Sequence, residues 1–133
     1  MLRSYMVHAV AVLLVTPEGI PLVKDPKKHP PFWKLPGGRG PATETAKEVA
    51  IRELKEEIGI ILIKEDLKVI HKEDRSTHIL TIFRADLPSL PKLKQQGAEG
   101  EEIGAFSPQE ILSMSDFFPN HLKIIKNQLK FLL

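Results

Sequence analysis

The sequence has no cysteine, one tryptophan and one tyrosine among its 133 residues. Without cysteine there is no disulfide framework, no thiolate zinc site and no cysteine nucleophile. The sequence also lacks an apolar run long enough to cross a bilayer, because His8 interrupts the apolar stretch near the N-terminus and no small-residue cleavage site follows it. We therefore expect no contact with a membrane and take the cytoplasm as the default location.

Neither sign of charge dominates the composition. Nineteen Lys and Arg oppose 17 Asp and Glu, for a formal net charge of +2. This excess is too small to indicate nucleic-acid binding, although Lys24, Lys27, Lys28, His29 and Lys34 form a local basic cluster. A chain of this length is expected to form one domain over residues 1–133, burying about two-thirds of its unfolded surface without covalent staples.

The apolar patterns predict strands mixed with helices. Strands are expected at residues 4–15, 20–24, 60–63, 67–72, 78–85 and 101–106, with one hairpin joining the first two and another joining 67–72 to 78–85. Helices are expected at 45–58, from 107 onward and at 120–132, and the proline-rich segment 25–38 is expected to be an ordered loop. Thr45 with Glu48 forms a capping-box pattern, and Gly59 supplies a left-handed helix stop. This order of elements predicts a mixed sheet with helices packed on it.

The predicted helix 45–58 carries an acidic stripe at the end that its dipole makes negative. Glu53, Glu56 and Glu57 fall on one side of the last turns when residues are placed at 100° intervals. Like charges at these spacings cost about 0.2–0.5 kcal/mol each. A hard dication such as Mg²⁺, which prefers oxygen ligands, would remove this cost. The alternative interpretation of the same stripe is a solvated acidic face.

The spacing of the glutamates favours the metal site. The segment resembles the Nudix box, G-x5-E-x7-R-E-U-x-E-E-x-G-U with U aliphatic. Every specified position is matched, by Gly38, Glu44, Arg52, Glu53, Leu54, Glu56, Glu57, Gly59 and Ile60. Average residue usage makes a chance match to all nine positions negligible. Residues 33–37 look like the usual lead-in to the box, and residues 100–103 look like the later acidic segment of the family.

The resemblance implies an α/β/α sandwich, with a mixed sheet flanked by helices, and the metal-dependent hydrolysis of a nucleoside diphosphate linked to another group. It implies that Mg²⁺, with Mn²⁺ as an alternative, is the cofactor. The ligands that it implies are Glu53, Glu56, Glu57 and a backbone carbonyl at Gly37 or Gly38. It also implies that Arg52 orients the catalytic glutamates, that Glu44 supports the box, and that the general base is one of Glu53, Glu57, Glu101 and Glu102.

The residues that contact the substrate are less constrained by the motif. Lys24 and His29, with the lysines beside them, are candidates for phosphate contacts, and a solvated loop is the alternative. Trp33 either flanks the substrate or packs in the core. Asn120 either reads a purine edge or caps the last helix.

We expect an enzyme, a pyrophosphohydrolase of the MutT-like kind acting on a small nucleoside triphosphate. Dinucleoside polyphosphates, ADP-ribose, nucleotide sugars and the 5′ end of RNA are the alternative substrates. A non-catalytic nucleotide sensor is the alternative from another class, and it is disfavoured because every glutamate of the box is present. A serine hydrolase is disfavoured because the sequence has no G-x-S-x-G elbow. The sequence does not predict an oligomeric state.

Overall fold

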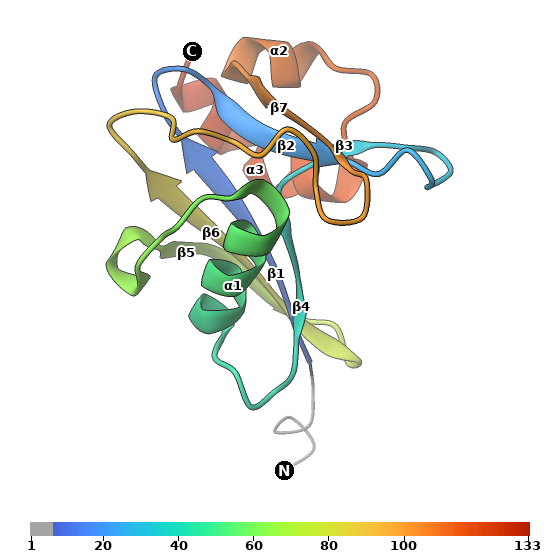
Figure 1. The fold of residues 1–133 in the computed structure, drawn as a ribbon, viewed down its shortest axis with the longest axis vertical. Coiled ribbons are helices and arrows are strands. Elements are labelled where there is room, and N and C mark those ends of the chain that lie inside the picture. The colour runs from blue at the N-terminus through green and yellow to red at the C-terminus, as the bar shows by residue number, and fades with distance from the viewer. Residues whose placement is uncertain (1–6) are drawn as a thin grey trace.

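The fold consists of two sheets and the helices that cover them, along residues 7–133, the part of the chain that this computed structural model describes (Figure 1). In chain order the elements are β1 (Val7–Val15), β2 (Ile20–Lys24), β3 (Trp33–Lys34), β4 (Gly37–Gly40), α1 (Ala46–Ile58), the 3₁₀ helix η2 (Lys64–Asp66), β5 (Lys68–Asp74), β6 (His78–Asp86), β7 (Glu102–Phe106), α2 (Pro108–Ser113) and α3 (Pro119–Phe131). Residues 4–6 of the first predicted strand lie outside the described residues.

The larger sheet is mixed and has the strand order β4-β1-β6-β5. β1 runs parallel to β6 and antiparallel to β4, and β5 and β6 form the predicted antiparallel hairpin. Successive β1 side chains face opposite sides of the sheet, so Val10 and Val12 pack with α1 while Ala11 and Leu13 pack with α3. Figure 1 shows α1 lying across one face of this sheet. The predicted α/β/α sandwich, a mixed sheet flanked by helices, is confirmed.

The predicted hairpin between the first two strands is wrong. Its turn forms, with the Gly19 N–H donating to the Thr16 carbonyl over 3.2 Å. Beyond the turn, however, β2 pairs with β3 and β7 in a second sheet of order β3-β2-β7. β6, which comes later in the sequence, pairs along all of β1, and β4 with Pro36 takes the other edge of β1 from His8 to Val12, where a β1–β2 hairpin would have continued. The predicted loop 25–38 therefore contributes to both sheets, through β3 and the start of β4.

Helix α1 begins and ends as its local sequence predicts. The Thr45 hydroxyl accepts from the Glu48 N–H at 3.1 Å, and the Glu48 carboxylate accepts from the Thr45 N–H at 2.8 Å. Gly59 adopts the left-handed conformation, with φ 81°, and its N–H donates to the Leu54 carbonyl at 3.0 Å. These caps hold the acidic end of α1 at a defined position against β4.

The predicted strand at residues 60–63 is wrong. Ile60 and Leu62 are buried in the core while Ile61 is 73% exposed, but the segment pairs with no strand among residues 7–133 and leads into η2. Its alternation reflects two side chains anchored in the α1 side of the core. The strand β7 and the helix α2, which starts with the capping box of Ser107, form where predicted. Within residues 7–133 no helix is long and apolar enough to span a membrane.

Candidate active site

The last turns of α1 lie against the two glycines at the start of β4. The Gly37 N–H donates to Glu57 Oε1 over 2.8 Å. A Cβ atom on Gly38 would overlap the Glu53 carboxylate and lie only 2.5 Å from its Oε2. Because neither glycine has a side chain, the backbone of β4 and both carboxylates can approach this closely.

Arg52 holds three carboxylates in a fork of ion pairs. Its Nε and Nη2 donate to the two oxygens of Glu44 at 3.1 and 2.8 Å. Its Nη1 donates to Glu53 Oε1 at 3.1 Å and lies 3.6 Å from Glu56 Oε2. The bidentate bond to Glu44 fixes the plane of the guanidinium and thereby the direction of the bond to Glu53. These contacts are the ones that the predicted orienting role of Arg52 and supporting role of Glu44 require.

Glu57 is the carboxylate whose ionisation is most strongly perturbed among these glutamates. Burial raises its pKa to about 7, and repulsion from Glu101 and Glu53 adds to the effect. The Gly37 N–H and the charge of Lys34 oppose this rise. Burial also raises the pKa of Glu53, although Arg52 favours its charged form. Glu53 and Glu57 are thus partly buried carboxylates whose negative charge the surrounding residues neutralise only in part.

This donor set fits a magnesium ion completed by the substrate. Among residues 7–133 no three Asp, Glu, His or Cys side chains converge into a closed cage, and the Glu56 side chain is 58% exposed and beside Arg52. Magnesium usually binds through one or two carboxylates and takes its other oxygens from waters and phosphates. Glu53 and Glu57, partly buried and incompletely neutralised, are the pair that a cation would stabilise.

The two later candidates for the general base lie in different environments. Glu101 is half-buried, accepts from the Glu99 N–H at 2.9 Å, and its charge acts on Glu57. The Glu102 side chain is 57% exposed and lies 4.0 Å from Lys24 Nζ. The structure therefore brings Glu101 into the electrostatic surroundings of Glu57 and leaves Glu102 at the surface.

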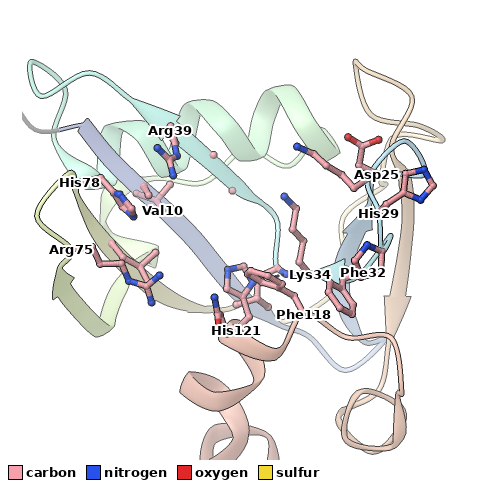
Figure 2. Close-up of a pocket in the computed structure, with 18 residues that line it drawn as sticks. Val10, Asp25, His29, Phe32, Lys34, Arg39, Arg75, His78, Phe118 and His121 are labelled. Carbon is pink, nitrogen blue, oxygen red and sulfur yellow. Dashed lines mark hydrogen bonds between the residues drawn. The ribbon is translucent and has the colours of Figure 1, made fainter.

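A cleft of ≈ 580 Å³ opens beside the β4 glycines, and both Gly37 and Gly38 line it. Its charged side chains are four cations, Lys28, Lys34, Arg39 and Arg75, and one acid, Asp25. Figure 2 shows the Lys34 side chain extended into the cleft, between Asp25 and His29 at one end and Arg39, Arg75 and His78 at the other. A cavity with this excess of positive charge favours an anionic ligand.

Two of the four predicted substrate residues lie in the cleft and two do not. His29 and Asn120 line it, whereas Lys24 and Trp33 are absent from its lining. Lys24 Nζ lies 3.5 Å from Asp116 Oδ2 and 4.9 Å from the centroid of the Trp33 ring. Trp33 in turn packs edge-on against Phe106 at 4.8 Å. In the second sheet, Lys24 therefore forms an ion pair and Trp33 packs against its neighbours.

Asn120 does not cap the last helix, so that alternative interpretation is wrong. Helix α3 starts one residue earlier than predicted, with Phe118 as its N-cap residue and Pro119 in its first position. No side chain makes a capping hydrogen bond there. The exposed Asn120 side chain is left on the wall of the cleft.

Sequence reasoning missed most of the cleft wall, including Lys34, Arg39, Arg75, His78, Phe118 and His121. Lys34 belongs to the basic cluster that the sequence displays and could have been included on that ground. The others come from β4, the β5–β6 turn, the first residue of β6 and the start of α3, and no local pattern distinguishes them from ordinary surface or helix residues.

Comparison with known proteins identifies the family to which this fold and site belong. A family model described as the NUDIX domain matches residues 6–128. The chain belongs to the NUDIX family. Over 55 residues this NUDIX chain is 44% identical to a Bacillus subtilis (strain 168) protein provisionally named an 8-oxo-dGTP diphosphatase. That match covers 41% of this chain and only 36% of the length of the relative.

Solved structures share the NUDIX fold over nearly the whole chain. The MutT protein from Bacillus halodurans has a TM-score of 0.75 at 21% identity, covering 93% of this chain and 82% of that one. A structure of MutT from work on Aliivibrio salmonicida and Vibrio cholerae has 0.73 at 23% identity, covering 96% and 99%. The NUDIX domain of Shewanella oneidensis NrtR, in complex with ADP ribose, has 0.74 at 20% identity, covering 96% and 89%.

Membership of the NUDIX family confirms the predicted family and, with the solved structures, the predicted fold. The predicted activity, hydrolysis of a phosphoric anhydride bond, stays a prediction. The substrate, the metal, the cytoplasmic location and the roles of single residues stay predictions.

Proposed function

We propose that this chain is a magnesium-dependent pyrophosphohydrolase that cleaves a nucleoside triphosphate to the monophosphate and pyrophosphate. The observation that carries the proposal is the position of Gly37 and Gly38, which line the cationic cleft and also contact Glu57 and Glu53. A nucleotide whose nucleoside lies in the cleft would therefore place its phosphates beside both carboxylates.

Each group around the glycines has a proposed role in this reaction. Glu53, Glu57 and the Gly38 carbonyl would hold the ion, and Arg52 keeps Glu53 in place through its 3.1 Å hydrogen bond. A bound divalent cation supplies charge neutralisation on the phosphate oxygens and lowers the pKa of a coordinated water. Lys34, whose charge acts on Glu57, is placed to contact the phosphates.

The chemical step is the attack of water on a phosphorus atom of the anhydride. The water oxygen forms the new P–O bond, the P–O–P bridge breaks, and the water proton passes to a carboxylate. We assign this proton to Glu101, because it lies within electrostatic range of Glu57 while Glu102 is at the surface beside Lys24.

A nucleotide sensor is the second candidate function, because the NrtR domain with which this chain shares its fold was solved with ADP ribose. Hydrolysis is favoured over sensing by the intact acidic face, in which Arg52 orients Glu53 and the buried Glu57 contacts β4. The two functions differ in one observable, since a sensor binds its nucleotide without releasing phosphate from it.

The requirement for metal and the substrate class can be tested together. We expect the metal-stripped protein to be inactive in EDTA and to recover activity with Mg²⁺ or Mn²⁺ but poorly with Ca²⁺, whose coordination is longer and looser. The measurement is the release of monophosphate and pyrophosphate from nucleoside triphosphates including 8-oxo-dGTP, ADP-ribose, a nucleotide sugar, a dinucleoside polyphosphate and a 5′-triphosphorylated RNA. Full turnover in EDTA would exclude the metal site, and turnover of ADP-ribose alone would replace the proposed substrate class.

Asn120→Ala is expected to change the preference among purine triphosphates without changing stability. The side chain lines the cleft and caps no helix, so its loss should move the free energy of unfolding by less than about 0.5 kcal/mol. The measurement is the ratio of kcat/KM values for two purine substrates, alongside a thermal melt. An unchanged ratio would show that Asn120 does not read the base.

A further inference from the structure

His121 holds a position that its helical surroundings alone do not explain. The start of α3 is joined to β3 by two backbone bonds, from the Trp33 N–H to the Asp116 carbonyl at 2.8 Å and from the Phe118 N–H to the Trp33 carbonyl at 2.7 Å. The next inward-facing N–H on this edge, that of Leu35, donates to His121 Nδ1 at 3.2 Å. The imidazole therefore takes the place that a backbone carbonyl would occupy in a continued ladder.

This bond determines the tautomer of the ring. Nδ1 accepts a hydrogen bond, so in the neutral imidazole the proton must be on Nε2. Burial lowers the pKa of His121 to about 4, and repulsion from Lys34 and Arg75 contributes to the shift. At neutral pH the side chain is consequently an uncharged ring with one acceptor, already used, and one N–H donor.

The remaining donor faces the cleft without a partner among residues 7–133. No hydrogen bond joins His121 Nε2 to any of these residues, and His121 lines the cleft beside Phe118 (Figure 2). The two rings meet edge to face, 4.9 Å apart at 82°, so the imidazole is held by packing as well as by Leu35. A donor fixed in place on the wall of the cleft can be matched by an acceptor on a ligand.

The groups around this donor also favour an acceptor on the ligand. Lys34 and Arg75, which line the same cleft, can only donate, and the one acid of the lining, Asp25, is at the end of the cleft away from Arg75 (Figure 2). An amino group at the edge of a base would meet another donor at His121, whereas a carbonyl oxygen would complete its hydrogen bond.

We propose that His121 is a specificity residue that donates its Nε2–H to the carbonyl oxygen of a 6-oxopurine, and so favours hypoxanthine and guanine over adenine. The proposal rests on the proposed nucleotide hydrolysis and adds the chemistry that selects the base. A purely structural role, in which His121 only satisfies the Leu35 N–H, is the competing explanation.

Two near-isosteric variants separate these roles. His121→Asn can keep an acceptor near the position of Nδ1 and removes the donor at Nε2. His121→Gln can keep a donor near the position of Nε2 and gives up the acceptor for Leu35. The substrates are ITP and ATP, which differ only at position 6 and the adjacent N1, assayed with Mg²⁺ alongside thermal melts of each protein.

We expect the parent to prefer ITP to ATP and His121→Asn to lose about tenfold or more of that preference, chiefly through KM, with a melting temperature near that of the parent. We expect His121→Gln to keep more of the preference while melting at a lower temperature. A His121→Asn protein with the ratio of the parent would overturn the proposal, as would a parent without preference.

Binding of IMP and AMP, measured by calorimetry, tests the same contact without turnover. The parent should bind IMP more tightly, and purine riboside monophosphate, which lacks the 6-oxygen, should bind like AMP. These ligands need no variant, so the test holds even if both substitutions impair folding. Failure of the parent to hydrolyse any nucleotide would count against the proposed function. A preference for IMP that His121→Asn leaves unchanged would count against His121 alone.

Discussion

Glu57→Gln is expected to lower the turnover of a nucleoside triphosphate at least about a hundredfold. Glutamine retains the shape of the side chain and an oxygen that can accept the Gly37 N–H, now at 2.8 Å from Glu57 Oε1. It removes the negative charge that would hold a metal ion beside the phosphates of the substrate. The measurement is kcat with saturating Mg²⁺, compared with the parent.

The same substitution should stabilise the metal-free protein at pH 8. Burial raises the pKa of Glu57 from an ordinary 4.5 to about 7, so the folded state holds its proton more tightly than the unfolded state. The parent therefore loses stability as the pH rises from about 4.5 to 7, and the non-titrating Gln variant does not. In EDTA at pH 8 the variant should be more stable by roughly 1–3 kcal/mol. With Mg²⁺ the order should reverse, because the parent gains more binding free energy.

Glu102→Gln is the matched control for Glu57→Gln. It makes the same chemical change on a side chain that is 57% exposed and only 4.0 Å from its ion-pair partner Lys24. We expect near-parent turnover and an unchanged response of the melting temperature to Mg²⁺. If Glu57→Gln behaved like this control in both measurements, Glu57 would have no part in metal binding or catalysis.

Gly38→Ala is expected to lower turnover about a hundredfold by displacing Glu53. The new methyl group would overlap the Glu53 carboxylate, whose Oε2 would lie 2.5 Å away. Because the obstacle is the end of a side chain, Glu53 can rotate away at the expense of its 3.1 Å bond to Arg52. The protein should still fold, but the Glu53 carboxylate should no longer lie beside Gly38. Turnover, and Mg²⁺ affinity by calorimetry, measure this effect.

Gly37→Ala provides the contrast, because its methyl group would overlap the backbone carbonyl of Val10 on β1. Backbone in the centre of a sheet cannot rotate away, so we expect the free energy of unfolding to fall by more than about 2 kcal/mol. Urea unfolding of both variants distinguishes the two effects. Parent-like turnover and Mg²⁺ affinity in Gly38→Ala would contradict the placement of Glu53 in the site.

The local sequence by itself determined the acidic helix and carried the resemblance to the NUDIX family. The start of α1 depends on Thr45 and Glu48, three residues apart, and its end depends on the left-handed Gly59. The arrangement of glutamates on one side follows from the helical repeat. Such interactions act within one or two turns of chain, so spacing in the sequence carries them completely.

Closeness in the sequence predicted one of the two expected hairpins and not the other. β5 and β6 pair as predicted, whereas β2 does not pair with β1, although only a short turn separates them. β6 takes one edge of β1 and β4 takes part of the other, and competition between distant strands for one edge leaves no trace in a local pattern.

The cleft and the protonation states of its residues were decided by the tertiary structure alone. The pKa of Glu57 is raised by burial against β4, and His121 finds its partner in Leu35, 86 residues earlier in the chain. Desolvation and hydrogen bonding depend on distance in space and on the exclusion of water. The sequence could therefore name Glu57 but not its pKa near 7, and it offered no sign that His121 lies in the wall of the site.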